Sequence, residues 1–258
     1  MTKLLQGRSV LITGAGSNVG RAAAVLFAEQ GARLVLTDLD PGRITADPLA
    51  DPAGRCIVAG DLTSAAVSEA AVVEAITRFG ALDVLCNTIG IDPPGARAAT
   101  ETTEADWDRV LAVNLKAVFL ACRAALRPMQ AAGHGVIVNV ASQGALLTLP
   151  GMTAYGVSKA GVLQLTRQIA ADYAAFGIRA NCVCPSGLEQ PSLDRLDVLA
   201  EADLARRTET MRRISPLGRV CSPQDVANAM LFLASDLAAY TTGAALPVEG
   251  GATAKLRF

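Results

Sequence analysis

Tyr155 and Lys159 lie four residues apart in the stretch YGVSK. Residues at this spacing share one face of a helix, so a phenol and an ammonium group can share a pocket. A free tyrosine, with a pKa of ~10, is too weak a base at neutral pH. A nearby positive charge favours the phenolate and lowers that pKa. The pair therefore indicates a general acid/base at position 155 that is tuned by its lysine neighbour.

Two polar residues upstream could complete such a site. Ser142 closes the apolar run VIVNVAS, 13 residues before Tyr155, and its hydroxyl could stabilise charge on a reacting oxygen. Asn114 lies in LAVNLKAVF, inside a long segment with helical spacing. Taken singly, each residue has an ordinary alternative: the tyrosine and lysine fit any helix face, and the asparagine could be a buried residue that bends a helix.

A glycine-containing loop, TGAGSNVG at residues 13–20, follows the first apolar run and precedes an alanine-rich helix. Free N–H groups and the helix dipole at such a junction bind phosphate, which points to Gly14, Ser17, Asn18, Val19 and Gly20. Asn18 stands where these loops favour glycine. Because asparagine tolerates positive φ better than other non-glycine residues, we expect a left-handed or glycine-like backbone at Asn18.

An acidic residue, Asp38, ends the second apolar run, RLVLTD, 18 residues after Gly20. A carboxylate there can accept both ribose hydroxyls of NAD and would repel the 2′-phosphate of NADP. Arg43 is the one nearby base, and it could equally be a solvated turn residue. The sequence therefore predicts NAD as the cofactor.

Two further run ends carry candidate cofactor residues. Asp61 and Leu62 follow the third run, where a side chain could reach the adenine amino group. Asn87 and Gly90 follow the fourth, where the backbone would pass close to the adenosine. Ligands of open α/β sheets bind outside the carboxyl ends of the strands, so the placement is suitable, although each residue could instead form a turn.

Seven short apolar runs alternate with alanine-rich segments of helical spacing. This alternation predicts a single-domain, doubly wound α/β fold over residues 1–258, with a parallel sheet of fully buried strands and helices on both faces. Residues 186–216 form a long insertion, expected to be a lid or binding loop or a short helical pair packed on the body. The expected strands are 9–13, 33–37, 55–60, 83–87, 135–141, 179–185 and 244–250, and the expected helices are 19–30, 64–79, 104–132, 154–176 and 223–235.

Asn114, Ser142, Tyr155 and Lys159, together with the glycine loop, resemble the short-chain dehydrogenase/reductase family from Gly7 to about Gly251. The resemblance implies a Rossmann fold and an NAD-dependent enzyme that interconverts a secondary alcohol and a ketone. It also implies that Lys159 holds the nicotinamide ribose and that Asn114 holds a proton-relaying water. The family commonly forms homotetramers through helices that correspond to 104–132 and 154–176 and through its last helix and strand.

The sequence departs from the family pattern at three places. Asn18 replaces glycine, and Asn87-Thr88-Ile89-Gly90 stands where the family has Asn-Asn-Ala-Gly. After the sixth run, the resemblance implies that Pro185, Gly187, Leu188 and Gln190 contact the nicotinamide, with Gln190 at the position of the usual threonine. These changes concern cofactor affinity and loop geometry and leave the proton-transfer groups intact.

The loops that should bound the substrate are largely apolar. Their apolar residues and the lack of Lys or Arg in QGALLTLPGM indicate a neutral, apolar alcohol or ketone. Arginines in the insertion, Arg207 among them, could still bind an anion. The expected substrate residues are Ser142, Gln143, Leu149, Met152, Tyr155 and Leu188.

Two alternative functions stay open: an NADPH-dependent ketoreductase such as a 3-oxoacyl reductase, and a non-catalytic dinucleotide sensor or scaffold.

The 258 residues carry a net charge of −1 with no basic run, which argues against nucleic acid as a partner. We expect no membrane span, no metal site and a cytoplasmic location. The six cysteines include Cys182 and Cys184, which we expect to be buried on one face of a strand.

Overall fold

The computed structural model describes residues 3–45, 54–92, 97–189 and 201–254. Its centre is a seven-stranded sheet in the order β3-β2-β1-β4-β5-β6-β7, in which every neighbouring pair is parallel. The chain therefore runs outward from β1, returns to the middle at β4, and then fills the other half. The strands are β1 (Ser9–Thr13), β2 (Arg33–Asp38), β3 (Arg55–Ala59), β4 (Val84–Asn87), β5 (Gly135–Val140), β6 (Ile178–Pro185) and β7 (Ala245–Val248).

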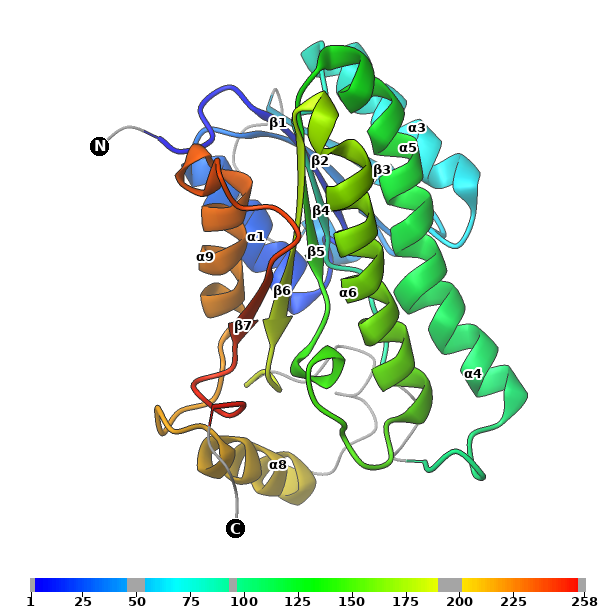
Figure 1. Ribbon diagram of the computed structural model, residues 1–258, viewed down its shortest axis with the longest axis vertical. Helices are drawn as coiled ribbons and strands as arrows, with labels where there is room; N and C mark the ends of the chain where they lie inside the picture. Colours follow the sequence, from blue (N-terminus) through cyan, green and yellow to red (C-terminus); the bar gives the residue numbers. More distant parts are fainter. Residues whose placement is uncertain (1–2, 46–53, 93–96, 190–200, 255–258) are drawn as a thin grey trace.

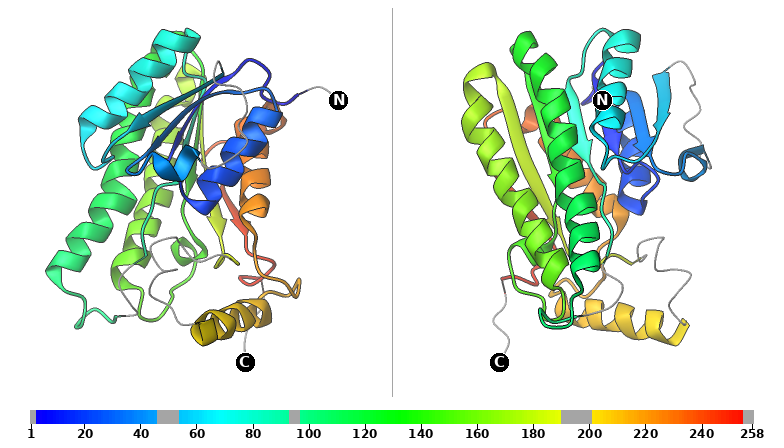
Figure 2. Two further views of the ribbon diagram at one scale, coloured as in Figure 1. Left: turned by 180° about the vertical axis from the view of Figure 1, so that it is seen from behind. Right: turned by 90° about the vertical axis from the view of Figure 1, so that its right-hand side faces the viewer.

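Helices cover both faces of the sheet, as the alternating pattern predicts (Figures 1 and 2). One face carries α1 (Asn18–Glu29) and α9 (Pro223–Ala234). The other carries α3 (Ala65–Phe79), α5 (Ala117–Ala132) and α6 (Thr153–Tyr173). The remaining α-helices of the described residues are α2 (Gly42–Thr45), α4 (Glu104–Leu111) and α8 (Glu201–Ile214).

The strand side chains divide the core into two apolar layers. In β1, Val10 and Ile12 pack with Phe27 of α1, whereas Leu11 packs with helices of the opposite face. Successive strand residues point to opposite faces, so a sheet covered on both sides needs continuous apolar strands. Cys182 and Cys184 lie in the same layer and are fully buried, which confirms the prediction for that pair.

The two edge strands are less buried than we expected. β3 is partly exposed along its whole length, and β7 likewise has no fully buried residue. The prediction that all seven strands are fully buried is therefore wrong for these two. Each edge strand has a neighbour on one side only, so part of its surface stays open to solvent.

The segment 104–132 is interrupted, although its spacing predicts one continuous helix. It forms α4, then a π-helical turn at Ala112–Lys116, then α5. The π-turn carries Asn114, whose side chain is completely buried. A π-bulge inserts an extra residue into the helical repeat and often marks a functional position.

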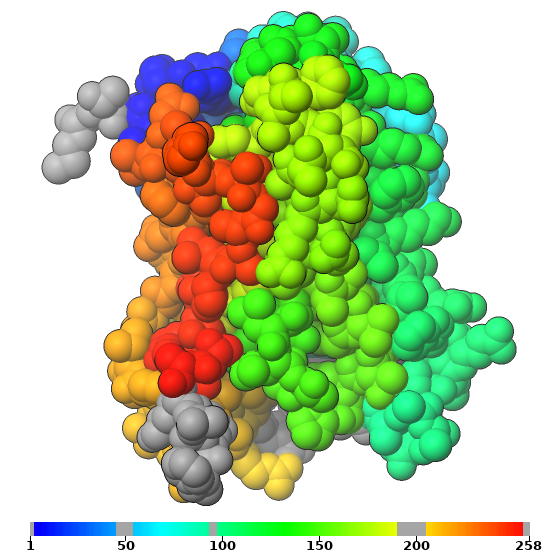
Figure 3. Space-filling model, in the orientation of Figure 1, coloured from blue at the N-terminus to red at the C-terminus, as the bar shows by residue number. Residues whose placement is uncertain are grey.

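The carboxyl ends of the strands all open toward the same end of the molecule, the lower end in Figure 1. Helix α8, from the predicted insertion 186–216, lies across that end. The space-filling view shows α6 beside the segment that leads into β7 on one broad face (Figure 3). Within the described part of the chain, no helix is long and apolar enough to cross a membrane.

Candidate active site

A cavity of about 650 Å³ lies at the carboxyl ends of the strands. It spans the point where the chain order reverses between β1 and β4, which is where open α/β sheets bind ligands. It extends from the end of β2 to Ser142, Tyr155 and Lys159. Predicted site residues that line it are Gly14, Ser17, Asn18, Val19, Asp38, Asp61, Leu62, Gly90, Ser142, Tyr155, Lys159, Pro185, Gly187 and Leu188.

The prediction of a left-handed backbone at Asn18 is wrong. Asn18 is the first residue of α1, and only glycines have positive φ among the described residues. Ser17 explains the difference, because its hydroxyl caps the helix by accepting the Gly20 N–H at 3.0 Å. The left-handed turn lies earlier, at Gly14 with φ +67°. Asn18 therefore needs no unusual conformation to present its side chain to the cavity.

Two glycines permit close approach between the loops of β1 and β4. A Cβ atom at Gly14 would lie 2.7 Å from the backbone of Ile89, so no larger residue fits. A Cβ atom at Gly90 would lie 3.0 Å from the Lys159 ammonium nitrogen. The first glycine lets the two loops pack together, and the second leaves room for the lysine.

The far end of the cavity carries Asp38, as predicted. One oxygen of its carboxylate accepts the Gly16 N–H at 2.9 Å, which ties the acid to the glycine loop. Arg43 also lines this end and forms an ion pair of 3.6 Å with Asp40. Asp61 caps its own turn by accepting the Thr63 N–H at 2.8 Å, while its neighbour Leu62 is buried against the cavity.

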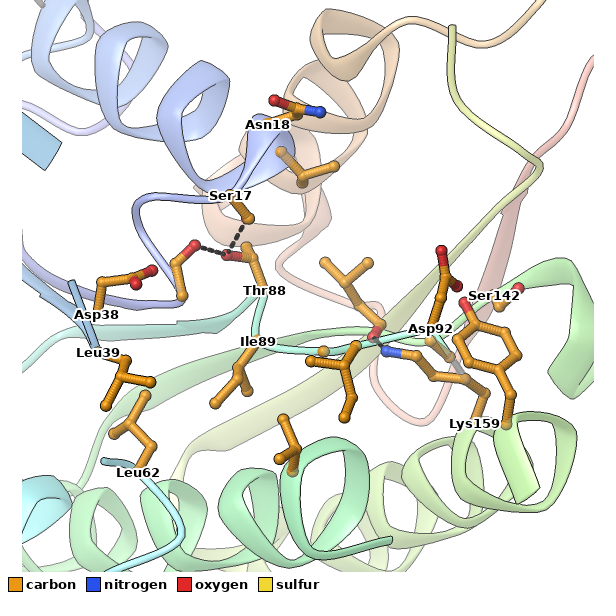
Figure 4. A pocket seen from close by; sticks show the side chains of 18 of the residues that line it. Ser17, Asn18, Asp38, Leu39, Leu62, Thr88, Ile89, Asp92, Ser142 and Lys159 are labelled. Atoms are coloured by element: carbon orange, nitrogen blue, oxygen red, sulfur yellow. Dashed lines mark hydrogen bonds between the residues drawn. The ribbon is translucent and has the colours of Figure 1, made fainter. Parts of the chain in front are cut away.

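At the opposite end, β5 and α6 bring three predicted catalytic residues together (Figure 4). Ser142, directly after β5, accepts the Gly144 N–H at 3.1 Å, which fixes its hydroxyl. The Lys159 ammonium lies 5.9 Å from the centre of the Tyr155 ring and donates to the Val140 carbonyl at 3.1 Å. The helical spacing thus places phenol and ammonium together, as the sequence pattern predicts.

Lys159 is almost completely buried, with 4% of its surface exposed. Burial lowers the pKa of this ammonium to about 8, while the nearby Cys182, Asp92 and Cys184 act in the opposite direction. The group is therefore mainly charged at neutral pH but loses its proton more readily than an exposed lysine. Such a poised cation can stabilise a phenolate beside it.

Asn114 holds the loop that follows β4. Its amide accepts the Ile91 N–H at 2.7 Å and donates to the Ile91 carbonyl at 3.0 Å. It also donates to the Ser158 hydroxyl at 3.2 Å. Asn114, which lies in the π-turn, therefore connects the loop after β4 to α6 through hydrogen bonds.

Some predicted residues do not line the cavity. Gln143, Leu149 and Met152 are absent from its wall, and Asn87 is completely buried in a network with Thr13 and Asn139. Gly20 lies behind the loop and donates its N–H to Ser17. Gln190 lies outside the described residues.

Sequence reasoning missed several cavity residues. Thr88 donates from its hydroxyl to the carbonyl oxygens of Thr13 at 2.7 Å and Gly14 at 3.0 Å. Asp92 lines the cavity together with Ser142 and Lys159, and Figure 4 draws all three side chains. Both residues lie within two positions of Gly90, and this closeness in sequence to a predicted cofactor residue could have indicated them. Arg109 of α4 also lines the wall. Arg207 of α8, one of the insertion arginines expected to be able to bind an anion, lines it as well and donates to the Leu188 carbonyl at 2.9 Å.

The described residues contain no group of three or more His, Cys, Asp or Glu side chains that could hold a metal ion. They do fit a dinucleotide. The first turn of a capped helix faces the cavity, the glycine contacts admit a ligand beside the backbone, and Asp38 stands at the far end.

A family profile, two relatives and a solved structure agree on the class of protein. The family profile described as "Enoyl-(Acyl carrier protein) reductase" matches residues 14–253. Cis-4-hydroxycyclohexanecarboxylate dehydrogenase of Sinomonas cyclohexanicum is 40% identical, with 96% of this chain and 97% of that protein covered. The 2-(S)-hydroxypropyl-CoM dehydrogenase 3 of Xanthobacter autotrophicus is 37% identical, covering 98% and 100%. The crystal structure of levodione reductase has a TM-score of 0.88 at 32% identity and covers 98% of this chain and 100% of that chain.

A dinucleotide cleft on a doubly wound sheet, with serine, tyrosine and lysine at its reacting end, defines an oxidoreductase that uses a nicotinamide cofactor. The chain belongs to the short-chain dehydrogenase/reductase family. It is an alcohol dehydrogenase/reductase, as its relatives are.

Proposed function

We propose that this protein interconverts a neutral secondary alcohol and its ketone with NAD as cofactor. The observation that carries the proposal is the shared cavity of Ser142, Tyr155 and Lys159 with Asp38 at its other end. NAD would accept or supply the hydride when bound. The chain's own residues would bind the substrate oxygen, move its proton and orient the cofactor.

Tyr155 would exchange the proton of the substrate hydroxyl. The buried Lys159 ammonium stabilises the phenolate form, because a positive charge in a site of low polarity acts strongly on a near neighbour. Ser142 would donate to the substrate oxygen and stabilise charge that develops there. Asn114 would hold the β4 loop and α6 together around these groups.

The cofactor preference rests on Asp38. Its carboxylate is held against the glycine loop through Gly16, so a 2′-phosphate in that position would meet a fixed negative charge. A second candidate is an NADP-dependent ketoreductase, and the presence of Arg43 in the same wall favours it. We rank it second because Arg43 already pairs with Asp40. We further propose a cytoplasmic homotetramer.

The test compares NAD and NADP with a panel of neutral secondary alcohols, using wild type and Tyr155→Phe. Removing the phenol hydroxyl should lower kcat by about 10²-fold or more, since it removes the general acid/base. NADH affinity, measured by fluorescence, should stay within about twofold. Tyr173→Phe is the matched control, because Tyr173 lies at the other end of α6 against Phe176.

Three results would contradict the proposal. Full activity in Tyr155→Phe would remove the catalytic assignment. A wild-type kcat/KM that is higher with NADP than with NAD would favour the ketoreductase instead. Binding of NADH without turnover of any alcohol or ketone would indicate a dinucleotide sensor.

A further inference from the structure

A buried hydroxyl of α6 contacts the backbone of the proposed acid/base and takes no part in the proposed proton transfer. Ser158 is completely buried and lies three residues after Tyr155, directly before Lys159. Its hydroxyl donates to the Tyr155 carbonyl at 2.7 Å. The same hydroxyl accepts a hydrogen bond from the Asn114 amide at 3.2 Å. Ser158 therefore links the backbone of Tyr155 to the buried amide that holds the loop after β4.

The beginning of α6 depends on contacts of this kind. Tyr155 is the third residue of the helix, and the N-cap residue, Met152, has no side-chain oxygen to accept the free N–H groups of the first turn. The helices α1 and α9 are instead capped by the side chains of Ser17 and Ser222. Helix ends fray more readily than helix interiors, so a hydrogen bond to the Tyr155 carbonyl from another side chain restrains the residue where restraint is needed.

The groups on either side of Ser158 are themselves held in place. The Asn114 amide is hydrogen-bonded to both the N–H and the carbonyl of Ile91, at 2.7 and 3.0 Å. The Lys159 ammonium donates to the Val140 carbonyl at 3.1 Å. The separation of phenol and ammonium therefore depends on where the Tyr155 backbone lies. Because charges attract more strongly at short range in a site of low polarity, a small displacement of Tyr155 weakens the stabilisation of its phenolate.

We propose that Ser158 is a positioning residue that holds the backbone of Tyr155 and thereby keeps the phenol beside the Lys159 ammonium. The inference rests on the proposed function, because it concerns the proton transfer by Tyr155. Without the hydroxyl, the buried Asn114 amide loses a partner and the first turn of α6 gains freedom. The phenolate is then stabilised less, and a higher pH is needed to form it.

The test measures the rate of alcohol oxidation with NAD in a single turnover as a function of pH, so that product release does not hide the proton transfer. Ser158→Ala should lower the maximal rate by about tenfold and raise the pH of half-maximal rate by about half a unit or more. NADH affinity, measured by fluorescence, should not change, because no cofactor residue is altered. Ser158→Cys keeps a similar shape with a weaker donor, so it should shift the profile in the same direction by less.

Thr166→Val is the matched control. The Thr166 hydroxyl is also completely buried on α6, donates to the Val162 carbonyl at 2.7 Å and accepts from the Asn139 amide at 2.9 Å. It thus makes the same pair of hydrogen bonds farther along the helix. Its loss should lower the free energy of unfolding without moving the pH profile.

A shift of the profile reports the position of Tyr155 relative to Lys159, because none of these substitutions changes a charged group. Among the described residues, the neighbours whose charge acts on Lys159 are Asp92, on the loop after β4, and Cys182 and Cys184 of β6. All three are the same in every variant.

An unchanged pH profile in Ser158→Ala, whatever the loss of rate or stability, would overturn the inference, because the hydroxyl would then only support the helix. If that variant does not fold, an unchanged profile in Ser158→Cys has the same meaning. An equal shift in Thr166→Val would also overturn it, since loosening α6 anywhere would then be enough. In each case turnover by wild type upholds the proposed function, whereas no turnover of any alcohol or ketone would contradict that function.

Discussion

A single buried cation, Lys159, governs the reacting end of the cavity. Its ammonium lies between α6 and β5 and donates to the Val140 carbonyl at 3.1 Å. A lysine in such a position costs stability, because its ammonium has lost most of its water. The same low polarity that makes the buried ammonium costly also strengthens its attraction for a phenolate at Tyr155.

The cost makes folding depend on pH in a predictable direction. Burial lowers the pKa of Lys159 from 10.5 to about 8. Below pH 8 the lysine is charged in both folded and unfolded chains. Between about pH 8 and 10.5 the folded state has released a proton that the unfolded state still binds, so this group adds stability as pH rises.

We therefore predict that Lys159→Met is more stable than wild type at pH 7 and that this advantage shrinks by about 2–3 kcal/mol toward pH 10. Urea unfolding of both proteins at pH 7, 8, 9 and 10 measures the difference. Burial also raises the thiol pKa of Cys122 and Cys221 in the folded chain, and this contribution is common to both proteins. A difference that does not change with pH would contradict the prediction, whatever its size.

At the scale of elements, the glycine loop depends on the loop of the neighbouring strand. Thr88 is 8% exposed, and its hydroxyl donates to the carbonyls of Thr13 and Gly14 and lies 3.4 Å from the Ser17 hydroxyl (Figure 4). Ser17 in turn caps α1. The Thr88 side chain, from the loop after β4, thus positions both the glycine loop and the N-terminus of α1.

We predict that Thr88→Val, which keeps the shape and removes the hydroxyl, weakens NADH binding about three- to tenfold and costs about 1–2 kcal/mol of folding free energy. The kcat should change little, because the proton-transfer groups are untouched. Thr88→Ser keeps the hydroxyl and is the matched control. Fluorescence titration with NADH and urea unfolding provide the measurements. Equal NADH affinity in the Val and Ser variants would exclude this role of the hydroxyl.

The elements themselves were largely predictable, and the exceptions have physical causes. Strands such as Ser9–Thr13 are covered on both faces, so their apolar runs mark their ends to within a residue or two. The π-turn around Asn114 has no such signature, because the flanking residues keep helical spacing.

Site residues were predictable where they share one helix, because the spacing in the sequence then fixes their relative positions. They were less predictable where contacts between different loops place them. Tyr155 and Lys159 share α6, so their sequence separation fixes their relation. Asn18 was misjudged because the conformation there depends on the Ser17 cap. Thr88 acquires its role from contacts with Gly14 and Ser17, which no local pattern contains.

At the scale of the whole molecule, two of the surfaces that expose apolar side chains lie on elements that the family uses for assembly. One lies on the α5 and α6 helices and includes Phe119 and Val157, which are 44% and 47% exposed. The other follows α9 and includes Leu237 and Tyr240, which are 64% and fully exposed. Two surfaces that each pair with their own copy can build a tetramer with D₂ symmetry, and both surfaces lie on the elements expected from the family resemblance.

We predict a tetramer that separates into dimers when either surface receives a charge. Phe119→Lys and Leu237→Lys should each give dimers, because each places a lysine in only one of the two interfaces, and the double variant should give monomers. Val73→Lys is the control, since Val73 is 60% exposed on α3, outside both surfaces. Light scattering after size-exclusion chromatography gives the mass of each protein. A monomeric wild type, or a double variant that remains tetrameric, would place the assembly elsewhere.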